Sequence, residues 1–347
     1  MSKKKIGING FGRIGRNLLR IIKANYCDEI EVVGINDVAD LSTSAHLFKY
    51  DSTYGAYKGS VEVDNNSLVI DGHKISVFKE RNPADIPWVN LGVEVVIEST
   101  GKFVDAIGNP DGGISGANVH INQGGAKKVI ISAPAKNEDL TVVLGVNSDQ
   151  YNPKLHHVIS NASCTTNCLA LPAKVVNDEF GIVYGAMTTI HSYTNDQNTI
   201  DAPHKDLRRA RAAAQNIIPT TTGAARAVSL VIPELSGKFD GYALRVPTST
   251  VSIVDFTALV DRNVTVDTLN QKLKEAADDG PMKDYLGYSS EPLVSSDYIG
   301  DARSSIIDAK STIVMGERIV KVVAWYDNEW GYASRTADLT AMVAKSL

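Results

Sequence analysis

The sequence predicts an α/β protein of two domains, a first domain built on a parallel sheet and a second, α+β domain with a mixed or antiparallel sheet. In the first half, apolar runs without polar alternation are separated by helical intervals, as in strands that are buried on both faces. In the second half, the candidate strands are longer and irregular stretches separate them. The chain has 347 residues, 43% of them hydrophobic, so it is long enough to bury two cores.

Runs of strand-forming residues set the order of the predicted elements. They cover residues 4–9, 30–36, 93–99, 128–132 and 141–146 in the first half, and 182–190, 242–246, 251–259 and 319–326 in the second. Between the first two runs, the apolar residues from Ile14 to Ile22 fall on one face of a helix, which completes a βαβ unit. Apolar residues from Leu339 to Leu347 also recur at helical spacing. We therefore expect a first domain over residues 1–163, completed by a helix over 331–347, and a second domain over 164–330.

Composition excludes several classes of protein. The net charge of −5 gives no basic field, so neither nucleic acid nor an anionic membrane is expected as a primary partner. No apolar run approaches the roughly 20 residues of a membrane span, and the N-terminus lacks the apolar core of a secretory signal. Three cysteines are too few for a disulfide scaffold, and an odd number suits a reducing compartment, so we expect a cytoplasmic protein. Cys164 and Cys168 have no matching His or Cys pair nearby, so no metal site is expected.

One low-complexity patch covers residues 108–116, which read GNPDGGISG. Glycine and proline at this density oppose regular secondary structure. We therefore expect an exposed loop there.

Gly10, Gly12 and Gly15 form a GxGxxG motif where the first predicted strand turns into the first helix. The first glycine permits the tight turn, the second lets a pyrophosphate approach, and the third allows close packing of helix and strand. Free N–H groups at the start of the helix face the phosphate charge. In this context the motif predicts a dinucleotide site of the Rossmann type, and a glycine-rich turn without a ligand is the alternative.

Asp37 follows the second predicted strand, where the adenosine ribose of a bound dinucleotide would lie. Its carboxylate can accept hydrogen bonds from both ribose hydroxyls, and its charge would repel a 2′-phosphate. NAD is therefore expected as the cofactor in preference to NADP. A solvated aspartate in a turn after a strand is the alternative.

Cys164 lies in the run Ser-Asn-Ala-Ser-Cys-Thr-Thr-Asn-Cys over residues 160–168, between a β-rich run and a segment of helical character. Small hydroxyl residues at this point indicate a helix N-terminus. The positive end of the helix dipole lowers the pKa of a thiol there and raises the thiolate fraction. Cys164 is therefore expected to be a nucleophile, with inert packing as the alternative. Cys168, one turn further along, is expected to pack.

His191 follows the strongly β run over residues 182–190. An imidazole titrates close enough to neutrality to pair with a thiolate and to take a proton from the reacting oxygen. His191 is therefore the candidate base for Cys164. A structural or solvated histidine at the end of a strand is the alternative, and the other six histidines are interpreted in that way.

Four segments carry a family resemblance. They are residues 9–16 around the glycine motif, residues 160–168 around Cys164, the run His191-Ser-Tyr-Thr194, and residues 325–332, which read WYDNEWGY. Together they closely resemble glyceraldehyde-3-phosphate dehydrogenase of the phosphorylating, glycolytic type, over nearly the whole chain. The cysteine run is highly specific to that family, whereas the glycine motif alone is not. The chain departs from the family pattern in residues 108–116, where the stretch is longer, and in the order Leu171-Pro172.

The resemblance implies roles for individual residues. Cys164 would be the nucleophile that forms a thioester, and His191 would be its base. Contacts to NAD are implied for Arg13, Ile14, Asp37, Arg81, Ser132 and Asn328, beside the glycines of the motif. The site of the substrate phosphate is implied at Thr194 and Arg245, and that of the attacking phosphate at Ser163, Thr165, Thr222 and Gly223, with Arg209 as a further candidate. Guanidinium groups, hydroxyls and backbone donors suit a phosphate dianion, although Arg245 could instead form a surface ion pair.

The implied reaction is the oxidation of D-glyceraldehyde 3-phosphate, with NAD and inorganic phosphate, to 1,3-bisphosphoglycerate. One alternative is erythrose-4-phosphate dehydrogenase of the same superfamily, which would act on a longer sugar phosphate. Another is a surface or nucleic-acid adhesion protein that keeps a dormant enzyme fold, and a secondary binding role remains open. The family also implies a homotetramer in which the loop over residues 194–211 packs against a neighbouring subunit's cofactor.

Overall fold

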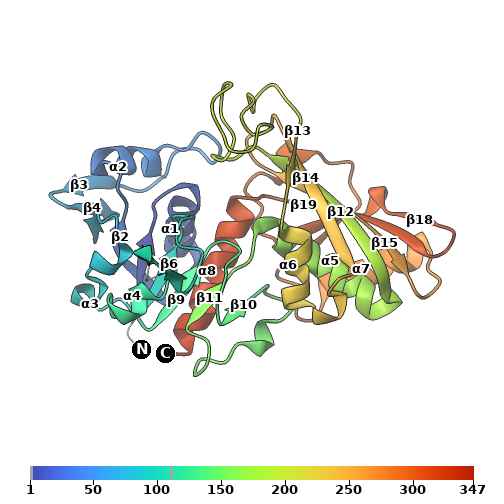
Figure 1. Cartoon of the computed structure of the whole chain (residues 1–347), viewed down its shortest axis with the longest axis horizontal. Helices are drawn as coiled ribbons and strands as arrows, with labels where there is room; N and C mark the ends of the chain where they lie inside the picture. Colours follow the sequence, from blue (N-terminus) through green and yellow to red (C-terminus); the bar gives the residue numbers. More distant parts are fainter. Residues whose placement is uncertain (1–2, 110–111) are drawn as a thin grey trace. The chain divides into compact units, whose positions relative to one another are not determined.

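The computed structural model describes residues 3–109 and 112–347 and divides into two compact units (Figure 1). Unit 1 comprises the chain up to Val142 together with Gln150–Ala162 and Ala333–Leu347. Unit 2 comprises Val143–Asp149 and Ser163–Tyr332. Within these described residues, no helix is both long and apolar enough to span a membrane.

Unit 1 contains a nine-stranded sheet in the order β10-β11-β9-β6-β1-β2-β5-β4-β3. Its parallel strands are β1 (Lys4–Asn9), β2 (Ile30–Asn36), β5 (His73–Phe78), β6 (Val95–Glu98), β9 (Lys128–Ile131), β10 (Leu140–Thr141) and β11 (Val158–Ser160). Two antiparallel strands, β3 (Val61–Asp64) and β4 (Ser67–Ile70), complete one edge. The central strands β6 and β9 are buried along their whole length. Their lack of polar alternation therefore reflects burial on both faces, as predicted.

Helices complete unit 1. They are α1 (Arg13–Asn25), α2 (Leu41–Lys49), the short α3 (Trp88–Leu91) and α4 (Val119–Asn122), and α8 (Trp330–Lys345), which belongs to this unit from Ala333 onward. Side chains hold α8 in place: Asn161 Nδ2 donates to Thr336 Oγ1 at 3.0 Å, and Tyr26 hydrogen-bonds Asp338. The last helix of the chain is thus part of the first sheet's packing, and the Rossmann-type α/β fold class is confirmed.

Unit 2 is built on a mixed eight-stranded sheet in the order β13-β14-β12-β15-β19-β17-β16, with β18 paired to β19. The strands are β12 (Ile182–Ser192), β13 (Ile218–Thr221), β14 (Phe239–Val246), β15 (Ser252–Val260), β16 (Leu286–Ser289), β17 (Ser305–Asp308), β18 (Ile313–Met315) and β19 (Ile319–Tyr326). The pairs β12–β14 and β16–β17 are parallel and the others are antiparallel. Helices α5 (Cys164–Phe180), α6 (Ala224–Val231) and α7 (Val266–Asp278) pack against these strands. The predicted mixed sheet of the second domain is confirmed.

The segment predicted as a strand over residues 141–146 is mostly not a strand. Only Leu140–Thr141 forms β10, and Val143–Asp149 belongs to unit 2. Gly145 has a φ of +84°, and a Cβ at this position would lie 2.9 Å from Tyr285 Cδ2. At Gly145 the backbone adopts a conformation that favours glycine and lies close to Tyr285 of unit 2. This turn explains why the valines before it do not continue the strand.

Residues 108–116 also differ from the expected loop. Gly108–Asn109 forms β7, which pairs antiparallel with β8 at Ile114–Ser115; Pro110 and Asp111 lie outside the described residues. A Cβ on Gly116 would lie 2.2 Å from the Ile107 carbonyl carbon. The expectation of no regular element was wrong because a glycine here permits the close backbone approach of a small ribbon.

Candidate functional site

The glycine turn of unit 1 joins β1 to α1 and is shaped by its backbone. Gly10 has a φ of +96°, in the left-handed region that favours glycine, and a Cβ there would lie 2.6 Å from the Thr100 backbone nitrogen. A Cβ on Gly15 would lie 2.3 Å from the Gly10 carbonyl oxygen, whereas one on Gly12 would meet no atom within 4 Å. The turn therefore has tight contacts at its first and third glycines and open space at its second, which fits a pyrophosphate lying over Gly12.

Asp37 lies beside this turn, at the end of β2. Its carboxylate accepts hydrogen bonds from the Phe11 N–H at 2.6 Å and from the Ala39 N–H at 2.8 Å. The first bond joins the acidic residue directly to the glycine turn, although 26 positions separate the two residues in the chain. The arrangement fits a nucleotide whose ribose reaches Asp37 while its phosphates lie at the turn.

A buried polar network holds the strand ends that form the turn. Glu98, at the end of β6, is 1% exposed and accepts hydrogen bonds from the side chains of Asn9 and His120 and from the Thr100 N–H. Trp88 Nε1 donates to His120 Nδ1 at 3.0 Å, so the other ring nitrogen of His120 carries the proton that it donates to Glu98. Four segments, at residues 9, 88, 98–100 and 120, are thereby held together around the start of the turn.

The other predicted NAD contacts are placed as follows. Arg13 and Ile14 begin α1, and Arg13 forms an ion pair with Asp51. Arg81 is exposed after β5. Ser132 follows β9, and its Oγ donates to the Glu98 carbonyl at 3.1 Å. Asn328 is in unit 2, where its Oδ1 accepts from Ser252 Oγ at 2.8 Å. Their contacts to NAD stay predictions.

Cys164 is the first residue of α5, as the cluster of hydroxyl residues predicts. Ser163 caps the helix, because its Oγ accepts a hydrogen bond from the Thr166 N–H at 2.9 Å. The Cys164 sulfur lies 3.5 Å from His191 Nε2. The structure therefore brings together the two residues that sequence spacing alone could not place side by side.

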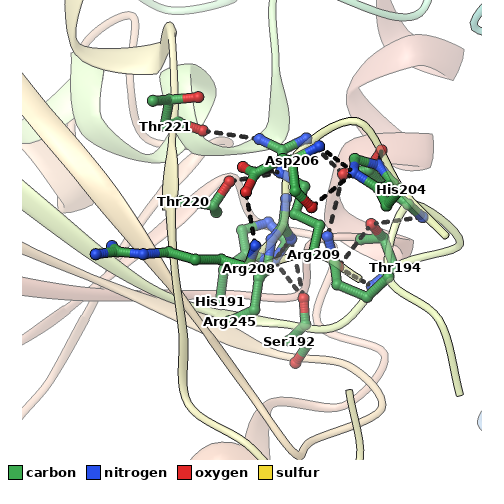
Figure 2. Close-up of polar contacts among 12 residues, drawn as sticks. His191, Ser192, Thr194, His204, Asp206, Arg208, Arg209, Thr220, Thr221 and Arg245 are labelled. Atoms are coloured by element: carbon green, nitrogen blue, oxygen red, sulfur yellow. Dashed lines mark hydrogen bonds and ion pairs between the residues drawn. The ribbon is translucent and has the colours of Figure 1, made fainter. Parts of the chain in front are cut away.

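His191 reaches the sulfur from β12 and is held on its other side. It is 4% exposed, and its Nδ1 lies 2.7 Å from the Ser192 carbonyl oxygen. Arg245 occupies the position on β14 that pairs with His191 across the parallel strands, and its Nη1 contacts both His191 Nδ1 and the same carbonyl (Figure 2). The neighbouring strands β12 and β14 and the start of α5 thus bring an imidazole, a guanidinium and a thiol into one row.

Burial determines the ionisation of this row. Cys164 keeps some exposed surface, but protein atoms surround its sulfur and this burial raises the pKa of the thiol, against the lowering effects of Arg245 and of the Thr165 hydrogen bond. Burial first, and the charge of Arg245 second, lower the pKa of His191 to about 3. The backbone N–H groups at the helix start do lower the pKa of Cys164, but desolvation by burial outweighs them, so the net shift is upward. Burial therefore disfavours the charged forms of both the thiol and the imidazole.

The candidate residues for an attacking phosphate lie at two helix ends. Ser163 and Thr165 flank Cys164 at the start of α5, and Gly223 precedes α6. Thr222 Oγ1 accepts from the Ala224 N–H at 3.2 Å. Thr166 Oγ1 donates to the Ala224 carbonyl at 3.4 Å, so the two helix ends are adjacent. The hydroxyls and backbone groups at the N-termini of the two helices therefore lie side by side.

Arg209 lies beside the strand that leads into Thr222. Its Nε donates to Thr220 Oγ1 at 2.6 Å and its Nη2 to the Thr221 carbonyl at 3.3 Å (Figure 2). Its Nη1 donates to Asp196 at 2.6 Å. Its position next to Thr222 fits a role in the phosphate site. One of its guanidinium nitrogens, Nη1, already donates to the Asp196 carboxylate.

Thr194 follows β12 and forms a small turn. Its backbone N–H and its Oγ1 both donate to Gln197 Oε1, at 2.9 and 3.2 Å. Its predicted role at the substrate phosphate stays a prediction.

Sequence reasoning missed two residues of this region, Asp196 and Tyr326. The Tyr326 hydroxyl is 2.9 Å from both Thr165 Oγ1 and Thr189 Oγ1, and its ring stands edge-on to His191 with centroids 5.9 Å apart. Tyr326 belongs to the WYDNEWGY run that carries the resemblance, which was the available signal. Asp196 had only its closeness to Thr194 in the chain. Among the described residues, no group of three or more His, Cys, Asp or Glu side chains could hold a metal ion.

Comparisons with known proteins decide the family. The family model described as "Glyceraldehyde 3-phosphate dehydrogenase, NAD binding domain" matches residues 4–106, and the one described as the C-terminal domain of the same enzyme matches residues 163–328. Curated relatives named glyceraldehyde-3-phosphate dehydrogenase are 58% identical over 340 residues in Geobacillus stearothermophilus and 54% identical over 343 residues in Streptomyces coelicolor, covering 98% and 99% of both chains. The chain belongs to the glyceraldehyde 3-phosphate dehydrogenase family.

Family membership confirms several predictions. The chain is an NAD-dependent oxidoreductase, and NAD is its cofactor. As a member of the glyceraldehyde 3-phosphate dehydrogenase family, it is a phosphorylating dehydrogenase of glycolysis. The glycine turn and Asp37 provide the local structure that an NAD-binding domain of this family requires.

Proposed function

We propose that the protein oxidises D-glyceraldehyde 3-phosphate with NAD and inorganic phosphate to 1,3-bisphosphoglycerate, through a thioester on Cys164. The observation that carries this proposal is the 3.5 Å approach of the Cys164 sulfur to His191 Nε2 at the start of a helix. A nucleophile and a base within reach of each other define an acyl-transfer site. The cluster of hydroxyl and guanidinium groups around this pair fits a phosphorylated substrate.

In the proposed reaction, His191 takes the proton of the Cys164 thiol, the thiolate attacks the aldehyde carbon, and the carbonyl oxygen takes that proton from His191 to give a thiohemiacetal. His191 then accepts the hydroxyl proton as the carbon loses its hydride, which leaves a thioester. NAD, held by Gly10, Gly12, Gly15 and Asp37, supplies the hydride acceptor when it is bound. Phosphate attacks the acyl carbon, the C–S bond breaks, and the thiolate is released with an acyl phosphate as product.

Two phosphate positions are needed, and the residues fall into two groups. Thr194 and Arg245 would hold the phosphate of the substrate. The hydroxyls and N–H groups of Ser163, Thr165, Thr222 and Gly223 would hold the attacking phosphate, with Arg209 beside them. Support comes from the adjacency of the α5 and α6 N-termini and from the row that His191 and Arg245 form on neighbouring strands.

Initial rates of NAD reduction test the proposal. With glyceraldehyde 3-phosphate we expect rapid reduction that depends on inorganic phosphate, and with erythrose 4-phosphate a much slower rate. A faster rate with erythrose 4-phosphate would favour the alternative substrate. A rate that is the same with and without phosphate would contradict the phosphorylating reaction.

We also propose that the protein is a cytoplasmic homotetramer. Support comes from unit 2, where Tyr184 and Tyr242 on the sheet are 65% and 49% exposed, and where Ile200 and Leu207 in the loop after β12 are 71% and 82% exposed. Tyrosine is among the side chains enriched at protein–protein interfaces relative to the rest of the surface. Sedimentation velocity on the purified protein should give the mass of four chains, and a monomer at micromolar concentration would contradict this.

A further inference from the structure

The turn between β14 and β15 contains a strained residue. Val251 has a φ of +67°, in the left-handed region where a β-branched residue is an outlier, and it is 3% exposed. A conformation of this kind persists only where the surrounding contacts hold it, and such residues cluster at functional sites. The contacts of this turn, residues 248–252, therefore indicate what the strain serves.

On one side the turn is attached to the end of β12. The Ser192 Oγ donates to the Val251 carbonyl at 2.7 Å, and the Ser192 N–H donates to Ser252 Oγ at 3.1 Å. Ser192 directly follows His191, whose Nδ1 lies against the Ser192 carbonyl. The turn is thus fixed to the strand end that carries the proposed base.

On the other side the turn holds the segment after β19. Thr250 Oγ1 donates to Asp327 Oδ1 at 2.8 Å, and Ser252 Oγ donates to Asn328 Oδ1 at 2.8 Å. All four side chains are at most 5% exposed. Two hydroxyls that flank the strained valine therefore fix two successive residues, one of which is the predicted NAD contact Asn328.

The Ser252 hydroxyl determines which end of the Asn328 amide is available to a ligand. Its oxygen accepts from the Ser192 N–H, and its buried hydrogen needs an acceptor of its own, which Asn328 Oδ1 provides. If the amide were rotated by half a turn, Nδ2 would face Ser252 and the hydroxyl hydrogen would lose this acceptor. The end of the amide that is left for a ligand is therefore its NH₂ donor.

The proposed reaction identifies the part of the cofactor that this donor suits. Hydride passes from the carbon bound to the Cys164 sulfur, so the residues around that sulfur have to receive the nicotinamide ring. Ser252 and Ser192 connect Asn328 to His191, which contacts the sulfur. The polar substituent of the ring is a carboxamide, and an NH₂ donor is complementary to its carbonyl oxygen.

We propose that Ser252 is a positioning residue for the nicotinamide end of NAD. Its hydroxyl holds the Asn328 amide with the NH₂ group directed to the carboxamide oxygen, and the strained turn keeps this amide in a fixed position relative to His191. The inference rests on the proposed function and deepens it, because it names a residue that aligns the hydride acceptor with the base without touching either substrate or cofactor.

Isothermal titration with two ligands tests this role. NAD contains the nicotinamide ring, whereas ADP-ribose lacks it and keeps the rest of the adenosine half. Ser252→Ala should weaken NAD binding about fivefold, the effect of one lost hydrogen bond, and leave the dissociation constant for ADP-ribose within twofold of the wild type. A merely structural loss would affect both ligands alike, so equal weakening of both, or no weakening of NAD binding, would overturn the proposal.

A matched variant controls for the loss of a buried serine. Ser305, on β17 of the same sheet, is also fully buried, and its Oγ accepts from the Cys168 thiol at 3.5 Å. Ser305→Ala should lower the melting temperature to a similar extent as Ser252→Ala and leave both dissociation constants unchanged. The ratio of the two constants then separates positioning of the amide from general destabilisation.

A double-mutant cycle tests whether Ser252 acts through Asn328. Asn328→Ala should weaken NAD binding and spare ADP-ribose, and adding Ser252→Ala should cause no further loss. Additive losses would overturn the proposal. If Ser252→Ala fails to fold, Ser252→Cys keeps nearly the same volume with a weaker donor and should show the same selective loss for NAD at a smaller size; a cysteine variant with wild-type affinity for NAD would also overturn it.

The outcome is distinguishable from a failure of the proposed function, because both ligands are titrated without an aldehyde. If Cys164→Ser abolishes NAD reduction while Ser252→Ala weakens NAD and ADP-ribose equally, the positioning role is wrong and the thioester route stands. If Cys164→Ser retains turnover, the proposed route is wrong whatever the two affinities are.

Discussion

The candidate site of unit 1 is formed mainly by backbone, whereas that of unit 2 is formed mainly by side chains. In unit 1 the glycine turn is made of backbone from six consecutive positions, Gly10 to Gly15, and its shape depends on which side chains are absent. In unit 2 the reactive row consists of side chains from α5, β12 and β14, which are joined only by packing of the sheet. A backbone site tolerates changes that keep the turn, whereas a side-chain site depends on each donor and acceptor. Substitutions in the glycine turn should therefore change stability and NAD binding, whereas substitutions in the reactive row should change the catalytic rate.

The largest effect is expected from Cys164→Ser. A serine hydroxyl is a far weaker nucleophile than a thiolate, so NAD reduction should fall at least about 10⁴-fold, while the dissociation constant for NAD, for which no contact from Cys164 is predicted, should stay within about twofold. Steady-state rates and fluorescence titration with NAD measure the two quantities. A parallel loss of NAD binding would contradict the separation between the sites.

His191→Asn is expected to have the next largest effect. Asparagine preserves part of the polar shape but cannot take a proton, so the rate should fall by roughly 10²- to 10⁴-fold, the usual range for a positioned base. Pre-steady-state measurement of NADH formation checks whether the loss is in the oxidation step. An unchanged burst of NADH would show that His191 is not the base.

Two glycine variants test whether the turn of unit 1 depends on the absence of side chains. In Gly15→Ala the new Cβ would lie 2.3 Å from the Gly10 carbonyl, so the turn must shift, and we expect a loss of about 1–3 kcal/mol in stability as well as weaker NAD binding. In Gly12→Ala no protein atom lies within 4 Å, so the melting temperature should stay close to that of the wild type while NAD affinity falls. Equal melting temperatures for the two variants would contradict this assignment.

The smallest effect concerns acid stability. The pKa of His191 is lowered to about 3 in the folded protein, whereas an unfolded histidine titrates near 6.5. Between about pH 6.5 and pH 3 the unfolded state binds more protons, so stability falls as the pH falls through this window and is fully present above it. His191→Asn should therefore lose less melting temperature between about pH 7.5 and pH 5 than the wild type does. An equal loss in both proteins would contradict a buried, neutral His191.

The same contrast explains how much could be predicted from the sequence. The strands of the first sheet and the glycine turn follow from local patterns, because burial on both faces and a requirement for glycine are visible in consecutive residues. The strands β3 and β5 were not predicted, since most of their residues are not buried. The segment after Thr141 was misassigned because Val143 and Val146 belong to unit 2 rather than to the first sheet.

In the candidate site, residue identities were easier to predict than their chemistry. The hydroxyl cluster located Cys164 at a helix start, but the sign of its pKa shift depends on how closely protein atoms surround the sulfur, which only the fold determines. Asp196 belongs to no motif, and the motif that contains Ser192 gave no role to its backbone carbonyl. Their importance arises from contacts with arginines that come from distant parts of the chain.

The path of the chain between the units has a consequence for biosynthesis. The chain leaves unit 1 after Val142, returns at Gln150, leaves again after Ala162, and comes back only at Ala333. During translation, the first sheet therefore lacks α8 until all of unit 2 has been synthesised. We expect unit 1 expressed without residues 333–347 to be recovered mainly as aggregate, and to regain solubility when that helix is fused behind Ala162 through a flexible linker.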